Sequence, residues 1–186
     1  MADRGDADVE EAGWIGRVVA LDDHDAFAAL VSRHQASVRG FLRRLTSGDA
    51  SRADDLAQET FWKAYRHLGS FKGRGRFLSW LFRIAYQEFV TDERRRHGTP
   101  VPLTDDMSSG EDVGGRVEDA RTFDQLIDAL RPEERSAIVL HYRHELTHAE
   151  IAEVLEAPLG TVKTLIRRGR ARLARAAGAP PLGDEA

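Results

Sequence analysis

Two clusters of basic side chains carry the strongest chemical signal in this sequence. The stretch 158–178 holds six basic residues and no acidic one, and the stretch 61–97 holds nine basic residues against three acidic ones. Either block alone is explained as well by an ordinary solvated helix face. Two basic blocks separated by an acidic connector favour two surfaces for one polyanion, which points to nucleic acid.

The second basic block divides into two faces when it is drawn as a helix. At 100° per residue, Val162, Ile166, Gly169 and Leu173 lie on one side, while long cations and the hydroxyl of Thr164 lie on the other sides. Arginine holds phosphates or bridges a guanine edge, and a small hydroxyl approaches a base closely. This division is typical of a DNA recognition helix.

The residues before that helix supply the elements that position it. Thr147 and Glu150 have the spacing of a capping box at the start of a short helix, and residues 157–160 predict a tight turn. A short helix, a tight turn and a longer basic helix together predict a helix-turn-helix.

Helical periodicity extends over most of the chain, and no segment predicts a strand, so the expected fold is all-α. Helices are expected over 26–45 with Asp23 or Asp25 as cap, from about residue 51 with a Ser51–Asp54 capping box, and over 77–95. Two small helical domains joined by a flexible acidic linker are predicted. The expected divisions are an acidic N-terminal extension 1–22, a first domain 23–97, a linker 98–120, a helix-turn-helix domain 121–177 and a tail 178–186.

Composition excludes several other classes of function. The 186 residues include no cysteine, which rules out disulfides and thiolate chemistry. No apolar run reaches the ~20 residues that span a bilayer, so a cytoplasmic protein without membrane insertion is expected. Phosphate-binding glycine loops and nucleophile elbows are absent, so we expect neither an enzyme nor a cofactor. The spacing of His141, His144 and His148 allows a metal site, but the expected break in the helix after His144 favours none.

Both domains contain short sequence motifs, and their order and spacing along the chain are informative. The first domain carries DDLAQETF at 54–61, FKG at 71–73 and FLSWLFRIA at 77–85, and the second carries LTHAEIA at 146–152 and PLGTVKT at 158–164. These motifs resemble bacterial RNA polymerase sigma factors, specifically the small two-domain extracytoplasmic-function (ECF) group of the sigma-70 family. The resemblance covers roughly residues 24–97 and 121–177.

The resemblance implies three sets of contacts. Core RNA polymerase is expected to bind Asp55, Gln58 and Glu59, which share one helix face. The minus-ten element, which is melted, is expected to meet the cations and the aromatic and amide side chains of Lys72, Arg74, Arg76, Trp80, Arg83, Gln87, Arg94 and Arg95. The minus-thirty-five duplex is expected to meet Thr161, Lys163, Thr164, Arg167 and Arg168. Trp80 is equally well explained as a core anchor.

The sequence departs from the family pattern at positions that affect promoter choice. The family usually has asparagine where this chain has Gln87, and a frequent arginine of the recognition helix is replaced by Leu165. The resemblance also implies control by an anti-sigma factor. A stand-alone DNA-binding regulator is the alternative reading, but it has no need of the Asp55–Glu59 surface and usually requires a dimerisation element, for which no heptad run is found.

Overall fold

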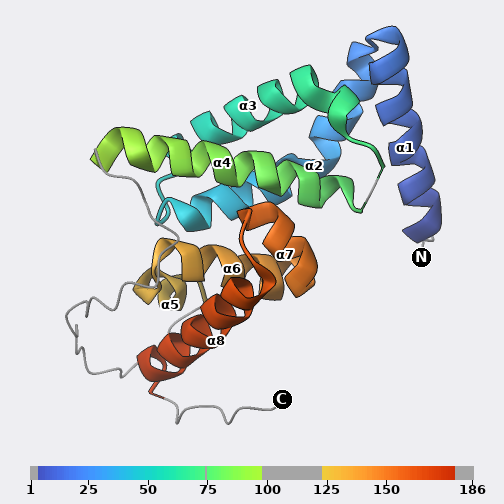
Figure 1. Ribbon diagram of the computed structural model, residues 1–186. Coiled ribbons are helices and arrows are strands. Elements are labelled where there is room, and N and C mark those ends of the chain that lie inside the picture. The colour runs from blue at the N-terminus through green and yellow to red at the C-terminus, as the bar shows by residue number, and fades with distance from the viewer. Residues whose placement is uncertain (1–3, 74, 98–122, 179–186) are drawn as a thin grey trace. The chain divides into compact units, whose positions relative to one another are not determined.

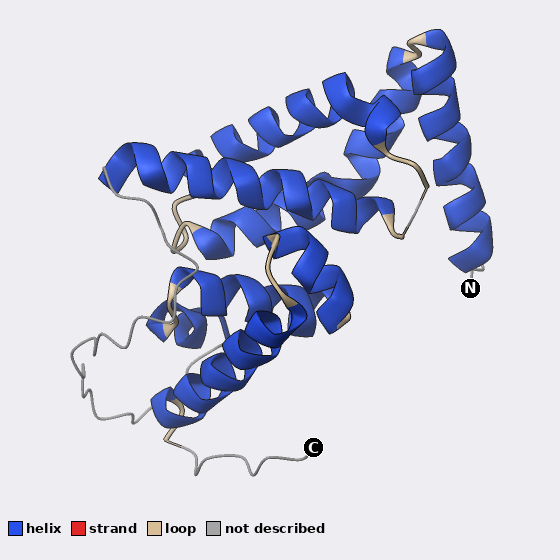
Figure 2. Ribbon diagram, viewed as in Figure 1, coloured by secondary structure: helices blue, strands red, loops and turns tan. Residues whose placement is uncertain are grey.

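The computed structural model describes residues 4–73, 75–97 and 123–178, and in these ranges it contains helices but no strand (Figure 2). The chain divides into two compact units, residues 1–91 and 92–186, with the boundary near the C-terminal end of the fourth helix. The predicted all-α class is confirmed. The expected linker 98–120 and residues 179–186 of the expected tail lie outside the described residues.

The first unit is built around its second helix, which packs against the first and the third. It contains α1 (Arg4–Leu21), α2 (His24–Leu45), α3 (Ala50–His67), the short 3₁₀ helix η1 (Leu68–Ser70) and most of α4 (Phe77–His97) (Figure 1). The apolar stripe of α2 packs on α3, and Phe41 of α2 meets Phe82 of α4 with ring centroids 5.0 Å apart. Leu30, Leu42 and Leu81 are fully buried beside these rings. Burial of these large apolar side chains is the main source of the unit's stability.

Aspartate side chains cap the starts of α2 and α3. Asp23 caps α2 by accepting a hydrogen bond from the backbone N–H of Ala26 at 2.9 Å. The sequence predicted either Asp23 or Asp25 as this cap. The prediction for α3 was wrong in detail. Asp49, rather than Ser51, is the cap, and its carboxylate accepts from the N–H of Arg52 at 3.0 Å. The reason is the turn through Gly48, whose positive φ of 85° brings Asp49 into the capping position.

Helix α1 was not expected from the sequence, which predicts only an acidic extension over residues 1–22. The helix packs against α2, and Val18 is its one fully buried apolar side chain among the described residues. Val9 and Leu21 are both 74% exposed. With so few apolar residues facing the core, α1 lacks the regular stripe by which a surface helix is recognised in a sequence.

The second unit contains the predicted helix-turn-helix. Its elements are α5 (Phe123–Leu126), the 3₁₀ helix η2 (Ile127–Ala129), α6 (Pro132–His144), α7 (His148–Leu155) and α8 (Leu159–Ala176). Helix α8 packs on both α6 and α7. The short helix, turn and long basic helix therefore occur where the sequence places them, with Ile151 and Leu155 of α7 buried against their neighbours.

The capping box of α7 gives a first testable prediction. The Thr147 hydroxyl oxygen accepts from the N–H of Glu150 at 3.2 Å, and the Glu150 carboxylate accepts from the N–H of Thr147 at 2.8 Å. Replacing Thr147 with alanine should lower the free energy of unfolding of this unit by ~1 kcal/mol, since an N-cap is lost. Thr147→Ser should retain most of the stability, because serine keeps the acceptor. Urea unfolding of the three proteins, followed by circular dichroism, measures the difference, and equal midpoints for all three would contradict it.

Candidate nucleic-acid and protein interfaces

The acidic face of α3 is presented to solvent as the sequence predicts. Asp55, Gln58 and Glu59 are all exposed, while Leu56 and Thr60 of the same helix point into the core. The Thr60 hydroxyl donates to the backbone carbonyl of Leu56 at 2.7 Å, which satisfies the one buried polar side chain of this segment. A surface with two carboxylates and an amide is suited to a basic partner.

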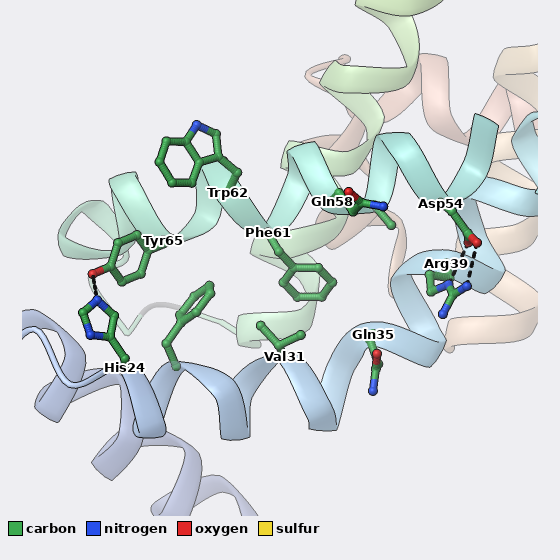
Figure 3. A pocket seen from close by; sticks show the side chains of 11 residues that line it. His24, Val31, Gln35, Arg39, Asp54, Gln58, Phe61, Trp62 and Tyr65 are labelled. Atoms are coloured by element: carbon green, nitrogen blue, oxygen red, sulfur yellow. Dashed lines mark hydrogen bonds and ion pairs between the residues drawn. The ribbon is translucent and has the colours of Figure 1, made fainter. Parts of the chain in front are cut away.

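An apolar groove between α2 and α3 adjoins this acidic face. It has a volume of about 610 Å³, and Figure 3 shows the rings of Phe61 and Trp62 and the side chain of Val31 around it. Trp62 is 55% exposed, which is unusual for so large an apolar side chain. Gln58 belongs both to the acidic face and to the lining of the groove. Phe61 and Tyr65 also line the groove and are only half-buried, and helical periodicity alone does not reveal such a groove.

Polar contacts hold both ends of the groove. At one end, Arg39 donates two hydrogen bonds to the Asp54 carboxylate, at 2.8 and 2.7 Å, and this hydrogen bonding raises the pKa of Arg39. At the other end, the Tyr65 hydroxyl donates to Asp22 and lies 3.0 Å from Nε2 of His24. The hydrogen bond to Asp22 raises the pKa of Tyr65. Polar side chains therefore lie at both ends of the groove, with the apolar lining between them.

The basic residues expected to meet the minus-ten element lie on and before α4. Lys72, Arg76 and Arg83 are exposed, as are Arg94 and Arg95 in the last turns of the helix. Arg74 lies outside the described residues. Gln87 is half-buried, and its backbone carbonyl accepts a hydrogen bond from the Thr91 hydroxyl at 2.8 Å. Exposed cations thus lie before the start of α4 and along its length.

Trp80 belongs to an aromatic cluster at the start of α4. Its ring stacks on Phe77 with centroids 5.5 Å apart, and Phe71 lies 5.7 Å away. Trp80 remains half-buried, whereas Phe77 is buried. Trp80 can therefore be both a packing anchor and a contact for the minus-ten element. One side of its ring packs on Phe77, and the ring still offers surface to solvent. Such a fixed aromatic surface is suited to stacking by an unpaired base.

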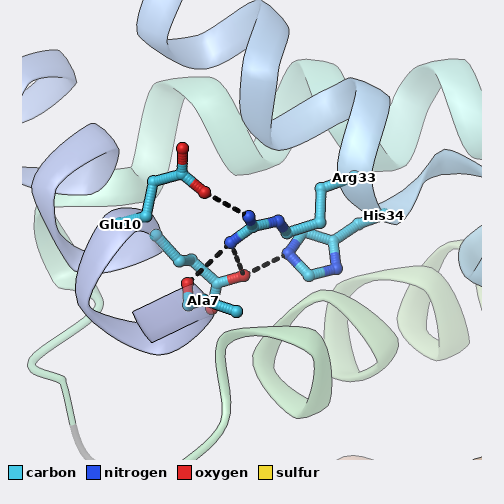
Figure 4. A network of polar contacts seen from close by, with 5 residues as sticks. Ala7, Glu10, Arg33 and His34 are labelled. Carbon is cyan, nitrogen blue, oxygen red and sulfur yellow. Dashed lines mark hydrogen bonds and ion pairs between the residues drawn. The ribbon is translucent and has the colours of Figure 1, made fainter. Parts of the chain in front are cut away.

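Helix α1 is held near this cluster by charged groups. Figure 4 shows Arg33 of α2 donating to the carbonyl of Ala7 at 2.7 Å and to the Glu10 carboxylate at 2.6 Å. Nε2 of His34 lies 2.6 Å from the Glu11 carboxylate, and the His34 ring contacts Phe77 with centroids 5.4 Å apart. His34 is buried, and the Glu11 carboxylate is its acidic partner. These contacts join α1 to the start of α4 through one histidine.

Helix α8 carries the expected division between a buried back and an exposed basic front. Val162, Ile166 and Gly169 are buried, and Lys163, Arg167 and Arg168 are exposed. The stripe differs from the prediction at its end, where Ala174 is buried and Leu173 only half-buried.

The two threonines expected to face DNA, Thr161 and Thr164, are half-buried on α8. The Thr164 hydroxyl donates to the carbonyl of Gly160 at 3.0 Å. Because its proton is used by the backbone, the hydroxyl oxygen is left as an acceptor and the methyl group as an apolar contact.

Two of the three clustered histidines come together, contrary to the sequence prediction. The rings of His141 and His148 lie with centroids 5.2 Å apart, although the helix breaks between them. The break is a turn through Glu145, which has a positive φ of 55° and folds α7 back beside α6. His144 is half-buried. Over the described ranges no group of three or more histidine and acidic side chains is arranged to hold a metal ion.

Comparison with known proteins shows that both units match models of one protein family. Residues 30–99 match the family model of sigma-70 region 2, and residues 120–173 match that of sigma-70 region 4. The RNA polymerase sigma-H factor of Pseudomonas aeruginosa is 35% identical over 173 residues, which cover 85% of this chain and 89% of the relative. The chain belongs to the sigma-70 family.

A second relative places this sigma factor in the ECF group. The ECF RNA polymerase sigma factor SigW of Bacillus subtilis is 35% identical over 172 residues, covering 83% of this chain and 90% of the relative. Among solved structures, the sigma factor RpoE of Bartonella quintana, crystallised with the anti-sigma factor NepR, aligns with a TM-score of 0.63 at 24% identity. That alignment covers 80% of this chain and 94% of RpoE and supports the fold.

The ranges matched by the two family models include the residues of all three predicted contact surfaces but begin after α1. In the part of the chain that the structure describes, no helix has the length and apolar character needed to cross a membrane. Three features of the structure were not predicted from the sequence: the apolar groove, the packing of α1 through charged side chains, and the histidine pair.

Proposed function

We propose that this protein is an alternative sigma factor that binds core RNA polymerase and directs initiation at specific promoters. The observation that carries the proposal is the exposure of two chemically opposite surfaces on separate units. One is the acidic face of α3 at Asp55, Gln58 and Glu59, and the other is the basic front of α8. A protein that joins an enzyme to DNA needs two such surfaces. It needs no catalytic group of its own.

The minus-thirty-five duplex is assigned to α8. Its N-terminal half presents Lys163, Arg167 and Arg168 above a buried apolar back, so the helix can enter a major groove without exposing its core side. Arginine binds a guanine edge or a phosphate, and Thr164 supplies an acceptor and a methyl group. Leu165 is half-buried and contributes no charge.

The minus-ten element is assigned to the start and outer face of α4. Lys72, Arg76 and Arg83 supply cations for the backbone of a displaced strand, and Trp80 supplies a ring against which a base stacks. Gln87, with a longer amide side chain than the asparagine usual in the family, is the residue that we assign to reading a base there. Arg94 and Arg95 reach duplex phosphates at the end of the helix.

An anti-sigma factor is the regulator that we propose. RpoE of Bartonella quintana was solved with such a partner, and the groove beside the acidic face of α3 offers an apolar site of about 610 Å³. A regulator that covers Gln58 and Trp62 would also block the polymerase, because Gln58 belongs to both surfaces.

Charge reversal at Arg168 tests the assignment of α8. In the holoenzyme, Arg168→Glu should weaken binding to a promoter fragment about 30- to 100-fold, since a well-placed arginine contact is worth ~1–3 kcal/mol and the new carboxylate repels phosphate. Fluorescence anisotropy with labelled promoter DNA measures the loss. Affinity for core polymerase should not change.

Arg175→Glu is the matched control for that experiment. Arg175 is exposed on the same helix but lies in its last turn, where it donates to the Ala171 carbonyl at 3.3 Å. Its reversal should cost much less DNA affinity. Equal losses in the two variants would mean that α8 acts only through its total charge, and the assignment of Arg168 would fail.

A further inference from the structure

The histidine pair of the second unit brings together side chains from two neighbouring helices. His141 lies in the last turn of α6 and His148 is the first residue of α7. Only three residues connect the two helices, and the positive φ of Glu145 reverses the chain so that the two rings meet. Both rings are half-buried and therefore reachable from solvent.

The hydrogen bonding of His141 fixes which nitrogen is available. Nδ1 of His141 lies 3.1 Å from the backbone carbonyl of Leu146, so Nδ1 carries the proton and donates it. The lone pair is then on Nε2, at the outer end of the ring. A histidine held in this way by a carbonyl is the usual arrangement of a metal ligand, because the hydrogen bond fixes both tautomer and ring direction.

The distance between the two rings allows shared coordination of one ion. An imidazole nitrogen binds Zn²⁺ at about 2.0–2.1 Å, which puts the ring centroid ~3.2 Å from the metal. Two such rings at a tetrahedral angle of about 109° have centroids ~5.2 Å apart. The observed separation of the His141 and His148 centroids is 5.2 Å.

We propose that His141 and His148 form a two-histidine site for a divalent transition metal, of the class that includes Zn²⁺, Ni²⁺ and Cu²⁺. Imidazole suits these ions, whereas Mg²⁺ and Ca²⁺ prefer oxygen ligands. Water completes the coordination, so the site is weaker than zinc centres with three or four protein ligands. The bound ion joins the end of α6 to the start of α7, and it stabilises the helix-turn-helix by binding only the folded unit.

Titration of the full-length, tag-free protein with Zn²⁺ alone tests the site. Isothermal titration calorimetry at pH 7.5 should give one Zn²⁺ per chain, and the temperature of unfolding of the second unit should rise with Zn²⁺ concentration. His141→Gln and His148→Gln should each weaken binding at least 10-fold and abolish this rise. His67→Gln, at an exposed histidine of α3, should leave both unchanged.

A measurement without substitutions guards against variants that fail to fold. Paramagnetic Cu²⁺, added in less than stoichiometric amount, should broaden the amide resonances around residues 141–148 first. No binding by the wild-type chain, equal affinity in all variants, or broadening that begins elsewhere would each overturn the proposal. The test is independent of the sigma-factor assignment, because it requires neither polymerase nor DNA.

Discussion

Glu59→Lys should lower the affinity of this sigma factor for core RNA polymerase at least 100-fold. Glu59 is exposed on α3 beside Asp55 and Gln58, and no described residue forms an ion pair with it, so its charge is available to a basic partner. Reversal removes one attraction and introduces a repulsion at the centre of the proposed interface, where paired charges have their largest effects. Surface plasmon resonance with immobilised core polymerase measures the change.

The control for this variant is an equal change of charge elsewhere on the same unit. Asp8→Lys changes an exposed acid on α1 and should reduce polymerase binding by less than about threefold. Glu59→Lys should keep the wild-type unfolding midpoint, since its side chain lies at the surface. If Asp8→Lys and Glu59→Lys lose polymerase binding equally, the effect is one of net charge and the α3 surface is wrongly assigned.

Gly169→Ala should destabilise the helix-turn-helix unit, although alanine is the better helix former. A Cβ atom at residue 169 would lie 2.6 Å from Cγ1 of Ile138, closer than Cβ atoms approach other atoms in folded proteins, and 3.1 Å from its Cδ1, which is a tight contact. Overpacking of this kind costs ~1–3 kcal/mol and exceeds the ~1 kcal/mol that alanine gains in helix propensity. The net loss of up to ~2 kcal/mol should then accelerate amide hydrogen exchange in α6 and α8 up to about 30-fold.

Two further variants separate the steric clash from other effects. Gly160→Ala places a Cβ atom in open space on the same helix, and it should not destabilise the unit. Ile138→Ala removes the atoms that collide, so Gly169→Ala should cost less in that background than in the wild-type chain. Additive losses in the double variant would show that the close approach of α8 to α6 at Gly169 is not the cause.

Elements defined by short-range signals were predictable from the sequence. Thr147 and Glu150 form the capping box that their spacing indicates, and the apolar stripe of α8 turns Val162 and Ile166 inward. Such signals depend on residues three or four positions apart, which a helix always brings together. The exposed face of Asp55, Gln58 and Glu59 was predictable for the same reason.

Features that depend on distant residues were not predictable. Helix α1 is fixed by Arg33 and His34, which lie more than twenty positions away from Glu10 and Glu11. The groove exists because Phe61 and Tyr65 stop short of filling the space between α2 and α3, which periodicity does not reveal.

The meeting of His141 and His148 was missed for a third reason. It depends on the left-handed backbone of Glu145, a conformation that glutamate rarely adopts and that its residue type does not signal.

In vitro transcription tests the central claim most directly. Purified bacterial core polymerase is incubated with a library of promoter fragments, with and without this protein, and the 5′ ends of the transcripts are mapped. We expect discrete start sites that depend on the protein and share one pair of minus-thirty-five and minus-ten sequences. Absence of protein-dependent start sites, together with specific binding of DNA by the protein alone, would contradict the claim and identify a stand-alone DNA-binding regulator.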